Sequence, residues 1–465
     1  MVITPYQGER AARRSDHKNV IAQSDHCRAS LVEVCPIDRD REKSVTRAMT
    51  LPPQATSAVK RSSMTSDPFV PAMPGNLDRW LLARNTDLVA VRRHLHMHPE
   101  LSHHEFETAA YVAKLLATAG LQPKLVQRGN GLICDIGEGD RVIALRADMD
   151  ALPLMDVKNV PYRSTVDGVT HACGHDVHTT VLLGVGMALS KLAAQCKLPG
   201  RVRLIFQPAE ESLNSGAMQM IDAGALKDVS SIFALHCAPQ FPVGMVAVRS
   251  GPFTAACDSV EVRLSGRGGH TARPHLTADL VSALGRVVTE VPALLGRLVD
   301  ARAGMSMVFG SIHAGEAFNA IPNEGIAKAT LRVLSREAWR DAPDLVEQLI
   351  KDVVQATGAT VDVKYTRGFP PVINDRLASA VIAGAASAAL GPDRVVEAEV
   401  SMGGEDFAFY LEHVPGAMIR LGTAIPGLDV KMDIHQAHFD VDERCIGYGI
   451  RTMVQTALHA LVSPL

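Results

Sequence analysis

Apolar positions along the chain fall into two recurring patterns from about residue 77 onward. Segments with apolar residues three and four positions apart predict helices, whereas short, wholly apolar runs predict buried strands. The expected helices cover 77–101, 106–120, 178–195 and 215–224, and the expected strands cover 131–137, 141–150, 201–211 and 231–236. Strands of this kind that alternate with helices are typical of a mostly parallel sheet covered by helices on both faces.

The pattern changes between about residues 256 and 367. Residues 258–266 alternate between apolar and polar positions, which predicts a half-buried strand. A helix, two strands, a second helix and a last strand follow, so the order is β-α-β-β-α-β, the ferredoxin-like arrangement. We therefore expect an α/β domain in two parts, 75–255 and 368–465, interrupted by an inserted α+β domain at 256–367.

Residues 1–74 differ from the rest of the chain. They are rich in Arg, Asp, Ser, Pro and Thr, and no apolar period persists in them. Two interpretations are open. The segment is a disordered extension, or the start codon is assigned too far upstream, since Met49, Met64 and Met73 all precede the first convincing helix.

Composition narrows the class of protein. The 465 residues exceed what one core of roughly 250–300 residues holds, and 47% hydrophobic with 21% charged residues is ordinary for a globular chain. A net charge of −3 and 4% aromatic residues give no reason to expect nucleic acid or an anionic membrane as a partner. No apolar run approaches the ~18 residues of a membrane span, and no secretory signal is present. The eight scattered cysteines therefore suit reduced thiols in the cytoplasm.

Residue types that bind metals follow several of the expected strands. Ligands of open parallel sheets bind beyond the carboxyl ends of the strands. The segments ADMD (147–150) and PAEE (208–211) and the residue His236 all follow such strands, and THACGHDVH (170–178) precedes a long apolar helix. Thiolate, imidazole and carboxylate groups are the usual donors to Zn²⁺ and its first-row neighbours. Their convergence predicts a pair of metal ions, with one glutamate of PAEE as a ligand and the other as general base.

Each motif alone also has a simpler explanation. CGHD suits a polar turn that caps a helix, PAEE suits a solvated turn, and His236 suits a partly buried histidine with a hydrogen-bond partner. A redox role for Cys173 is not favoured because CxxC is absent. GRGGH (266–270) lacks the strand–GxGxxG–helix context of a nucleotide site, and no GxSxG elbow predicts a nucleophilic serine. Either Asp150 or Asp176 could orient a ligating imidazole.

Seven motifs occur in a fixed order: RRHLHMHPELSHHEFET, ALRADMDALPL, HACGHDVHTT, LIFQPAEE, GRGGHTARPH, FNAIPNE and MGGEDFAFY. Together they resemble the M20 metallopeptidase family, and specifically its amidohydrolase branch of hippurate hydrolases, N-acyl-amino-acid amidohydrolases and plant auxin-conjugate hydrolases. The resemblance extends from about residue 77 to the C-terminus. It implies a zinc-exopeptidase-like α/β catalytic domain with a binuclear metal centre, and an inserted lid that often also forms the dimer.

The resemblance also implies roles for single residues of two motifs. Cys173 and His175 of HACGHD resemble metal ligands. In PAEE, Glu211 resembles a ligand and Glu210 the general base, and His236 resembles the ligand that follows the third strand.

The last ligand in this branch is a histidine near the C-terminus. In IHQAHFDVD, His435 matches it, with His438 as the alternative, and Ala437 replaces the usual proline. Asp148 takes the place of a histidine that binds metal in other M20 branches. Asp150 resembles the residue that orients the site.

The lid motifs imply groups that touch the substrate. His270 of GRGGHTARPH resembles a histidine that stabilises the tetrahedral intermediate, often from across a dimer. Asn319 and Arg332 resemble substrate-binding residues, and a guanidinium is well suited to holding a carboxylate. Gly403 and Gly404 would let the backbone approach the substrate closely.

These resemblances predict a metal-dependent amidohydrolase of the EC 3.5.1 class. It would cleave N-acyl amino acids such as hippurate to a carboxylic acid and a free amino acid, using two divalent ions (Zn, Mn, Co or Ni). The alternatives are an M20 dipeptidase, an N-acyl-diaminopimelate deacylase, or a non-catalytic metal- or ligand-binding scaffold. The expected partners are the small-molecule substrate and further copies of the chain, in a homodimer or homotetramer formed through the lid.

Overall fold

The structure is a computed structural model that describes residues 74–126, 128–427 and 432–463. The two interpretations of residues 1–74 concern a segment that lies, except for Pro74, outside the described residues. No helix in the described part is both long enough and apolar enough to cross a bilayer.

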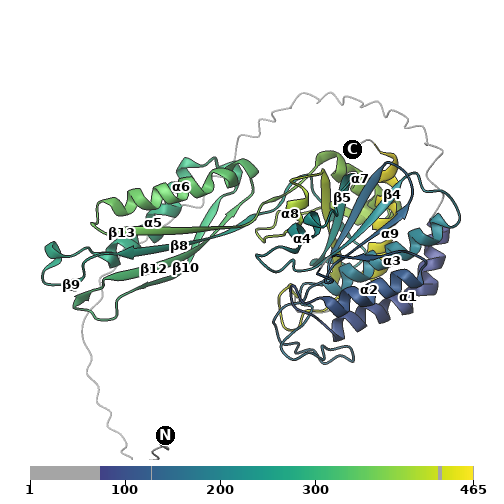
Figure 1. Ribbon diagram of the computed structural model, residues 1–465, viewed down its shortest axis with the longest axis horizontal. Helices are drawn as coiled ribbons and strands as arrows, with labels where there is room; N and C mark the ends of the chain where they lie inside the picture. The colour runs from purple at the N-terminus through teal and green to yellow at the C-terminus, as the bar shows by residue number, and fades with distance from the viewer. Residues whose placement is uncertain (1–73, 127, 428–431, 464–465) are drawn as a thin grey trace, which may run out of the picture. The chain divides into compact units, whose positions relative to one another are not determined.

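An eight-stranded sheet forms the centre of the first unit (Figure 1). The strand order is β1-β2-β4-β3-β5-β16-β6-β15. The four central strands β4, β3, β5 and β16 run parallel, whereas β1, β2 and β6 pair antiparallel with a neighbour. The bounds are β1 Lys124–Leu125, β2 Leu132–Gly137, β3 Val142–Asp148, β4 Arg201–Gln207, β5 Val229–Pro242, β6 Val246–Val248, β15 Val395–Glu397 and β16 Gly416–Ala424.

Helices cover both faces of this sheet because its strands are apolar on both sides. Every residue of β3 is buried, as a strand between two helical layers requires. One apolar core lies between the sheet and α1, α2, α3, α7 and α9, and another lies beneath the shorter α4 and α8. The bounds are α1 Pro74–Met97, α2 Phe106–Thr118, α3 His175–Ala193, α4 Gly216–Asp222, α7 Arg376–Leu390, α8 Phe407–Tyr410 and α9 Cys445–Val462. The short strands β7 (Gly251–Thr254) and β14 (Val372–Asn374) pair with each other.

A second sheet belongs to residues 256–369, called the inserted unit below. It is antiparallel with the order β10-β12-β8-β13, and α5 and α6 pack on one of its faces (Figure 1). Its elements are β8 Ala256–Ser265, α5 Leu280–Leu298, β10 Ser306–Ala314, β12 Glu324–Val333, α6 Arg336–Gln355 and β13 Thr360–Phe369, with the small pair β9 Gly269–His270 and β11 Ala320–Ile321. This chain order and strand order are the ferredoxin-like arrangement.

The predicted fold class is confirmed, with one correction to the sheet. An α/β unit carries an inserted α+β unit, as the change of apolar period at about residue 256 indicated. The large sheet is mixed, because the antiparallel strands β1, β2 and β6 flank its parallel centre. The short strands β1 and β6 leave too few apolar positions for their direction to be read from sequence.

Candidate metal centre

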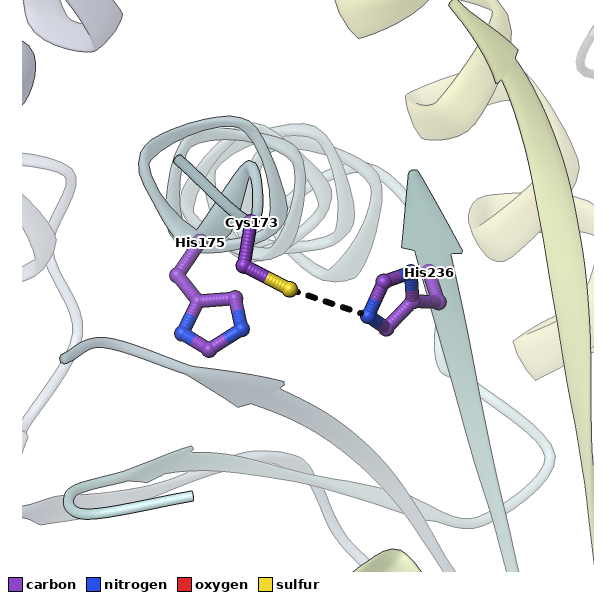
Figure 2. A group of neighbouring side chains, drawn as sticks. All are labelled: Cys173, His175 and His236. Atoms are coloured by element: carbon purple, nitrogen blue, oxygen red, sulfur yellow. Dashed lines mark hydrogen bonds between the residues drawn. The ribbon is translucent and has the colours of Figure 1, made fainter. Parts of the chain in front are cut away.

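Three buried side chains converge at the carboxyl end of the large sheet. Gly174 adopts a left-handed conformation (φ +92°) at the start of α3, which places Cys173 just before the helix and His175 in its first turn. His236 lies on strand β5, and its Nε2 is 3.4 Å from the Cys173 Sγ (Figure 2). One donor atom from each of these three residues lies within 4.8 Å of the others, so the group can hold a cation.

A second donor group shares Cys173 with the first. It adds Glu211 and His435, whose Oε1 and Nε2 lie 3.0 Å apart. The backbone N–H of His435 donates to the carbonyl of Ala172 at 2.7 Å, and the residue has a φ of +60°. These features bring His435 to the cluster, while His438 is exposed and belongs to neither donor group among the described residues. Because Cys173 lies in both groups, its thiolate is placed to contact two ions.

Asp150 orients one ligand from each of these groups. His175 Nδ1 donates to the Asp150 carbonyl at 2.9 Å and lies 3.1 Å from its Oδ1, which leaves Nε2 turned toward the other donors. The Asp150 Oδ2 accepts from the backbone N–H of Glu211 at 3.0 Å. His175 Nε2 and Glu211 Oε1 are themselves buried without a hydrogen-bond partner. Asp176, the other candidate for this orienting role, points away and pairs at 2.8 Å with Arg92.

Asp148 and His178 lie beside His175 but are already paired. The Asp148 Oδ1 accepts from His178 Nδ1 at 2.6 Å, and Oδ2 accepts from Arg146 at 2.5 Å. His178 Nε2 in turn accepts the backbone N–H of Cys237 at 2.8 Å. Both ring nitrogens of His178 are therefore engaged, and this pair supports the strand ends that carry the other residues.

Glu210 lies next to the donor atoms in a buried, acidic setting. Its Oε2 is 3.9 Å from His175 Nε2, and its oxygens lie within 4.8 Å of carboxylate oxygens of Glu405 and Asp406. Burial and the nearby Glu405 raise its pKa well above the usual range. The preceding Ala209 has a strained φ of +51°.

Sequence reasoning missed the charged residues that surround Glu210. Arg146 is fully buried and pairs with Asp148, with Glu405 at 3.2 Å and with Asp406 at 2.8 Å. The signal is present in two quoted motifs, because ALRADMD contains an arginine beside its two aspartates and MGGED contains two carboxylates after its glycines. A buried charge in an apolar strand needs a partner, so the arginine in ALRAD already indicated a nearby carboxylate.

The donor set has the charge and chemistry of a site for divalent cations. Burial and the carboxylates of Glu211 and Glu210 raise the pKa of the Cys173 thiol well above its usual range. Burial lowers the pKa of His175, but Asp148 and Asp150 outweigh it and raise the pKa to about 10. The cluster therefore attracts positive charge, and divalent ions would displace these protons from sulfur and nitrogen donors. A set of one thiol, three imidazoles and one carboxylate fits zinc and its first-row neighbours.

The predicted substrate groups fall into two places. Arg332 Nη1 lies 3.7 Å from the position that a Cβ would occupy on Gly404, and a Cβ there would also meet Cys257 at 2.9 Å, so only glycine fits. Gly403 is exposed beside it, and its N–H donates to the Ser401 hydroxyl at 3.1 Å.

His270 and Asn319 lie together elsewhere, on the inserted unit. His270 ends β9, whose partner β11 begins directly after Asn319, and both side chains are exposed. Among the described residues, His270 belongs to none of the groups that could hold a cation.

Comparison with known proteins identifies the family. The model of Peptidase family M20/M25/M40 matches residues 144–459. The chain belongs to this family. The N-acetyl-L-cysteine deacetylase of Bacillus subtilis is 36% identical over 361 residues, which cover 77% of this chain and 84% of that protein. A Rhodococcus jostii protein, provisionally named glutamate–cysteine ligase 2-3, is 47% identical over 368 residues, which cover 79% of this chain and only 46% of that protein.

A solved M20 structure shares the fold. The YXEP protein of Bacillus subtilis, described as a dinuclear metal binding peptidase, is 33% identical with a TM-score of 0.72, and the match covers 82% of this chain and 99% of that one. The predicted membership of the amidohydrolase branch is confirmed. The chain is a metal-dependent M20 hydrolase with candidate ligands for a dinuclear centre.

Proposed function

We propose that this M20 hydrolase cleaves the amide bond of N-acyl amino acids, including hippurate-like substrates, to give a carboxylic acid and a free amino acid. The observation that carries the proposal is the placement of Glu210, a buried carboxylate 3.9 Å from the unpartnered His175 Nε2. The name of the Bacillus subtilis deacetylase, an N-acyl amino acid enzyme, supports the same substrate class.

Cys173, His175, Glu211, His236 and His435 would hold two divalent ions, for which zinc, manganese, cobalt and nickel are the candidates. When bound, such ions polarise the acyl carbonyl and lower the pKa of water at the site. Asp150 keeps two of these ligands in orientation through its contacts with His175 Nδ1 and the Glu211 N–H.

Glu210 takes the proton from the attacking water and later gives it to the leaving amine. Its position 3.9 Å from His175 Nε2, beside the donor atoms, suits both proton transfers. Arg332, beside Gly404, binds the free carboxylate of the substrate as a guanidinium fork.

His270 would stabilise the oxyanion from a second copy of the chain. This assignment requires a homodimer, or a homotetramer built from dimers, formed through the inserted unit. Strand β10 offers a free sheet edge in the described chain, with Val308 60% exposed and Ile312 47% exposed. Apolar edge strands of this kind are ready to pair with another strand. We place the activity in the cytoplasm, where the scattered cysteines suit a reducing compartment.

Two substitutions separate the proposed roles of the adjacent glutamates. Glu210→Gln should keep both ions while turnover of benzoylglycine falls by about 10²–10⁴-fold, the usual contribution of a general base. Glu211→Gln should lose metal as well as turnover. Metal content by mass spectrometry and hydrolysis of N-acyl amino acids, dipeptides and N-acyl diaminopimelates are measured with and without chelator.

The matched control is Glu397→Gln, which removes an exposed carboxylate paired with Arg249. It should change neither metal content nor turnover. Near-normal turnover in Glu210→Gln would refute the role of general base. Failure of the metal-loaded wild type to hydrolyse any N-acyl amino acid would refute the substrate class.

A further inference from the structure

Arg420 is a half-buried arginine that lies directly beside a proposed metal ligand. It sits on β16, in parallel register with His236 on β5. Aligned residues of neighbouring strands point to the same face of a sheet, so the side chains of Arg420 and His236 lie side by side on one face. The Arg420 Cζ is 4.9 Å from the ring centroid of the fully buried Phe253, which holds the guanidinium in place.

The three buried arginines of the large-sheet unit, Arg92, Arg146 and Arg203, are paired with carboxylates, and Arg420 is not. Arg92 pairs with Asp176 and two further carboxylates, and Arg146 pairs with three. In the described residues, Arg420 belongs to none of the ion pairs closer than 4.0 Å. Burial accordingly lowers its pKa, and the charge of Glu405 only partly offsets this effect. A cation that is desolvated without a partner is strongly unfavourable unless an anion joins it.

The side chain is nevertheless within reach of a ligand. Arg420 is only half-buried by its accessible surface, unlike Arg92 and Arg146. Its aligned neighbour His236 belongs, with Cys173 and His175, to one of the groups that could hold a cation.

A second guanidinium lies at the same loop. Arg332 Nη1 lies 3.7 Å from the Cβ position of Gly404, and Glu405, whose charge raises the pKa of Arg420 against the effect of burial, follows Gly404 directly in the chain. One arginine suffices for the carboxylate that every N-acyl amino acid carries, which leaves the other for a second anionic group.

We propose that Arg420 binds a second carboxylate of the substrate, so that the preferred substrates are N-acyl amino acids with two carboxylates. This inference rests on the proposed function and names the substrate class of the same site. The second carboxylate can come from the acyl half, as in N-succinyl amino acids, or from the amino-acid half, as in N-acyl glutamate. Both present the same planar anion to a guanidinium fork.

The experiment compares charged substrates with neutral ones of similar shape in the metal-loaded enzyme. The pairs are N-acetylglutamate with N-acetylglutamine, and N-succinylalanine with N-butanoylalanine. The wild type should prefer the charged member of at least one pair, and the preferred pair identifies the half that carries the carboxylate. Arg420→Met should lower the charged-to-neutral ratio of kcat/KM by about 10- to 100-fold, as expected for loss of a charge-assisted hydrogen bond. Arg420→Lys should restore part of the ratio.

Two further variants serve as references. Arg332→Met should lower kcat/KM for both members of each pair and keep their ratio. Arg249→Met, at a partly exposed arginine paired with Glu397, should leave the ratio unchanged. An equal loss for charged and neutral members in Arg420→Met, or no preference for charged substrates in the wild type, would overturn the proposal.

Binding distinguishes this proposal from the proposed function itself. The same compounds are titrated by calorimetry into metal-loaded Glu210→Gln, with and without Arg420→Met. If the charged members bind more tightly than the neutral ones and Arg420→Met abolishes this difference, the Arg420 site is supported. This holds even if the wild type hydrolyses none of these compounds, because a lack of hydrolysis would refute only the proposed reaction. Equal binding of both members would overturn the Arg420 assignment.

Discussion

Gly174 joins two proposed metal ligands, and its replacement by alanine should distort the metal centre. The residue has a φ of +92° between Cys173 and His175. A Cβ built on it would lie 2.8 Å from the Cys237 Sγ and 2.9 Å from its Cβ. Cys237 lies on the buried strand β5, directly after His236, so it cannot move aside without shifting a third proposed ligand.

The destabilisation has two parts that a second glycine separates. The left-handed backbone costs an alanine roughly 1–2 kcal/mol, and forcing an extra methyl into a packed core costs roughly 1–3 kcal/mol more. Gly120, at the end of α2, has a similar φ of +83° but nothing within 4 Å of its Cβ position. Gly120→Ala should therefore show the first cost alone, and Gly174→Ala should show both, for a total of about 2–5 kcal/mol.

Thermal unfolding and metal content test this comparison. At roughly 2 °C per kcal/mol for a large domain, Gly174→Ala should lower the Tm of the metal-free protein several degrees further than Gly120→Ala. It should also weaken metal binding, measured by competition with a chelator, while Gly120→Ala should not. Equal Tm shifts in the two variants with full metal retention in both would refute the argument from packing against Cys237.

Two other predictions concern the surroundings of the site. Burial and the charge of Asp150 raise the pKa of Glu105 from 4.5 to about 7, so its contribution to stability is present below about pH 4.5 and is lost as the pH rises through about 7. In urea unfolding, the free energy of unfolding of the wild type, measured relative to Glu105→Gln, should fall by up to about 3 kcal/mol as the pH rises through the range set by these two pKa values. A difference between the two proteins that does not change with pH would contradict this prediction. Val308→Lys on the free edge of β10 should convert the proposed dimer to monomers, as measured by light scattering, and should reduce turnover while the metal is retained. The control Ser259→Lys, on the central strand β8, should leave the dimer intact. A dimer that persists in Val308→Lys would exclude β10 as the interface.

Much of the fold could be predicted because apolar period and chain order change together. The apolar run VIAL at 142–145 indicated a strand covered on both faces, and the alternating residues 258–266 indicated a strand covered on one. The direction of β1 and β6 could not be read in this way, because strands of two and three residues carry too little pattern. Their pairing is decided by neighbours distant in sequence, such as the contact of β6 with β16.

The site was predictable where a motif combines several donor types and unpredictable where one residue acts through distant partners. HACGHD and PAEE indicated metal chemistry because thiol, imidazole and carboxylate occur close together. The single charge in the apolar strand GAMIRLGT indicates that Arg420 needs a partner, but nothing near it in sequence identifies that partner. The register between β16 and β5 places Arg420 beside His236, and the register between strands distant in sequence cannot be read from either strand alone.

The position of the inserted unit affects how the chain is made. Strand β5 ends at Pro242, and its parallel neighbour β16 begins about 170 residues later, at Gly416. Translation proceeds at ~5–20 residues per second, so one edge of β5 stays unpaired for roughly 10–35 s until β16 is synthesised. The inserted unit is continuous in sequence and can fold during this interval. The nascent catalytic sheet, by contrast, exposes an unpaired apolar edge, which makes this stage of synthesis the one most dependent on chaperones and most open to aggregation.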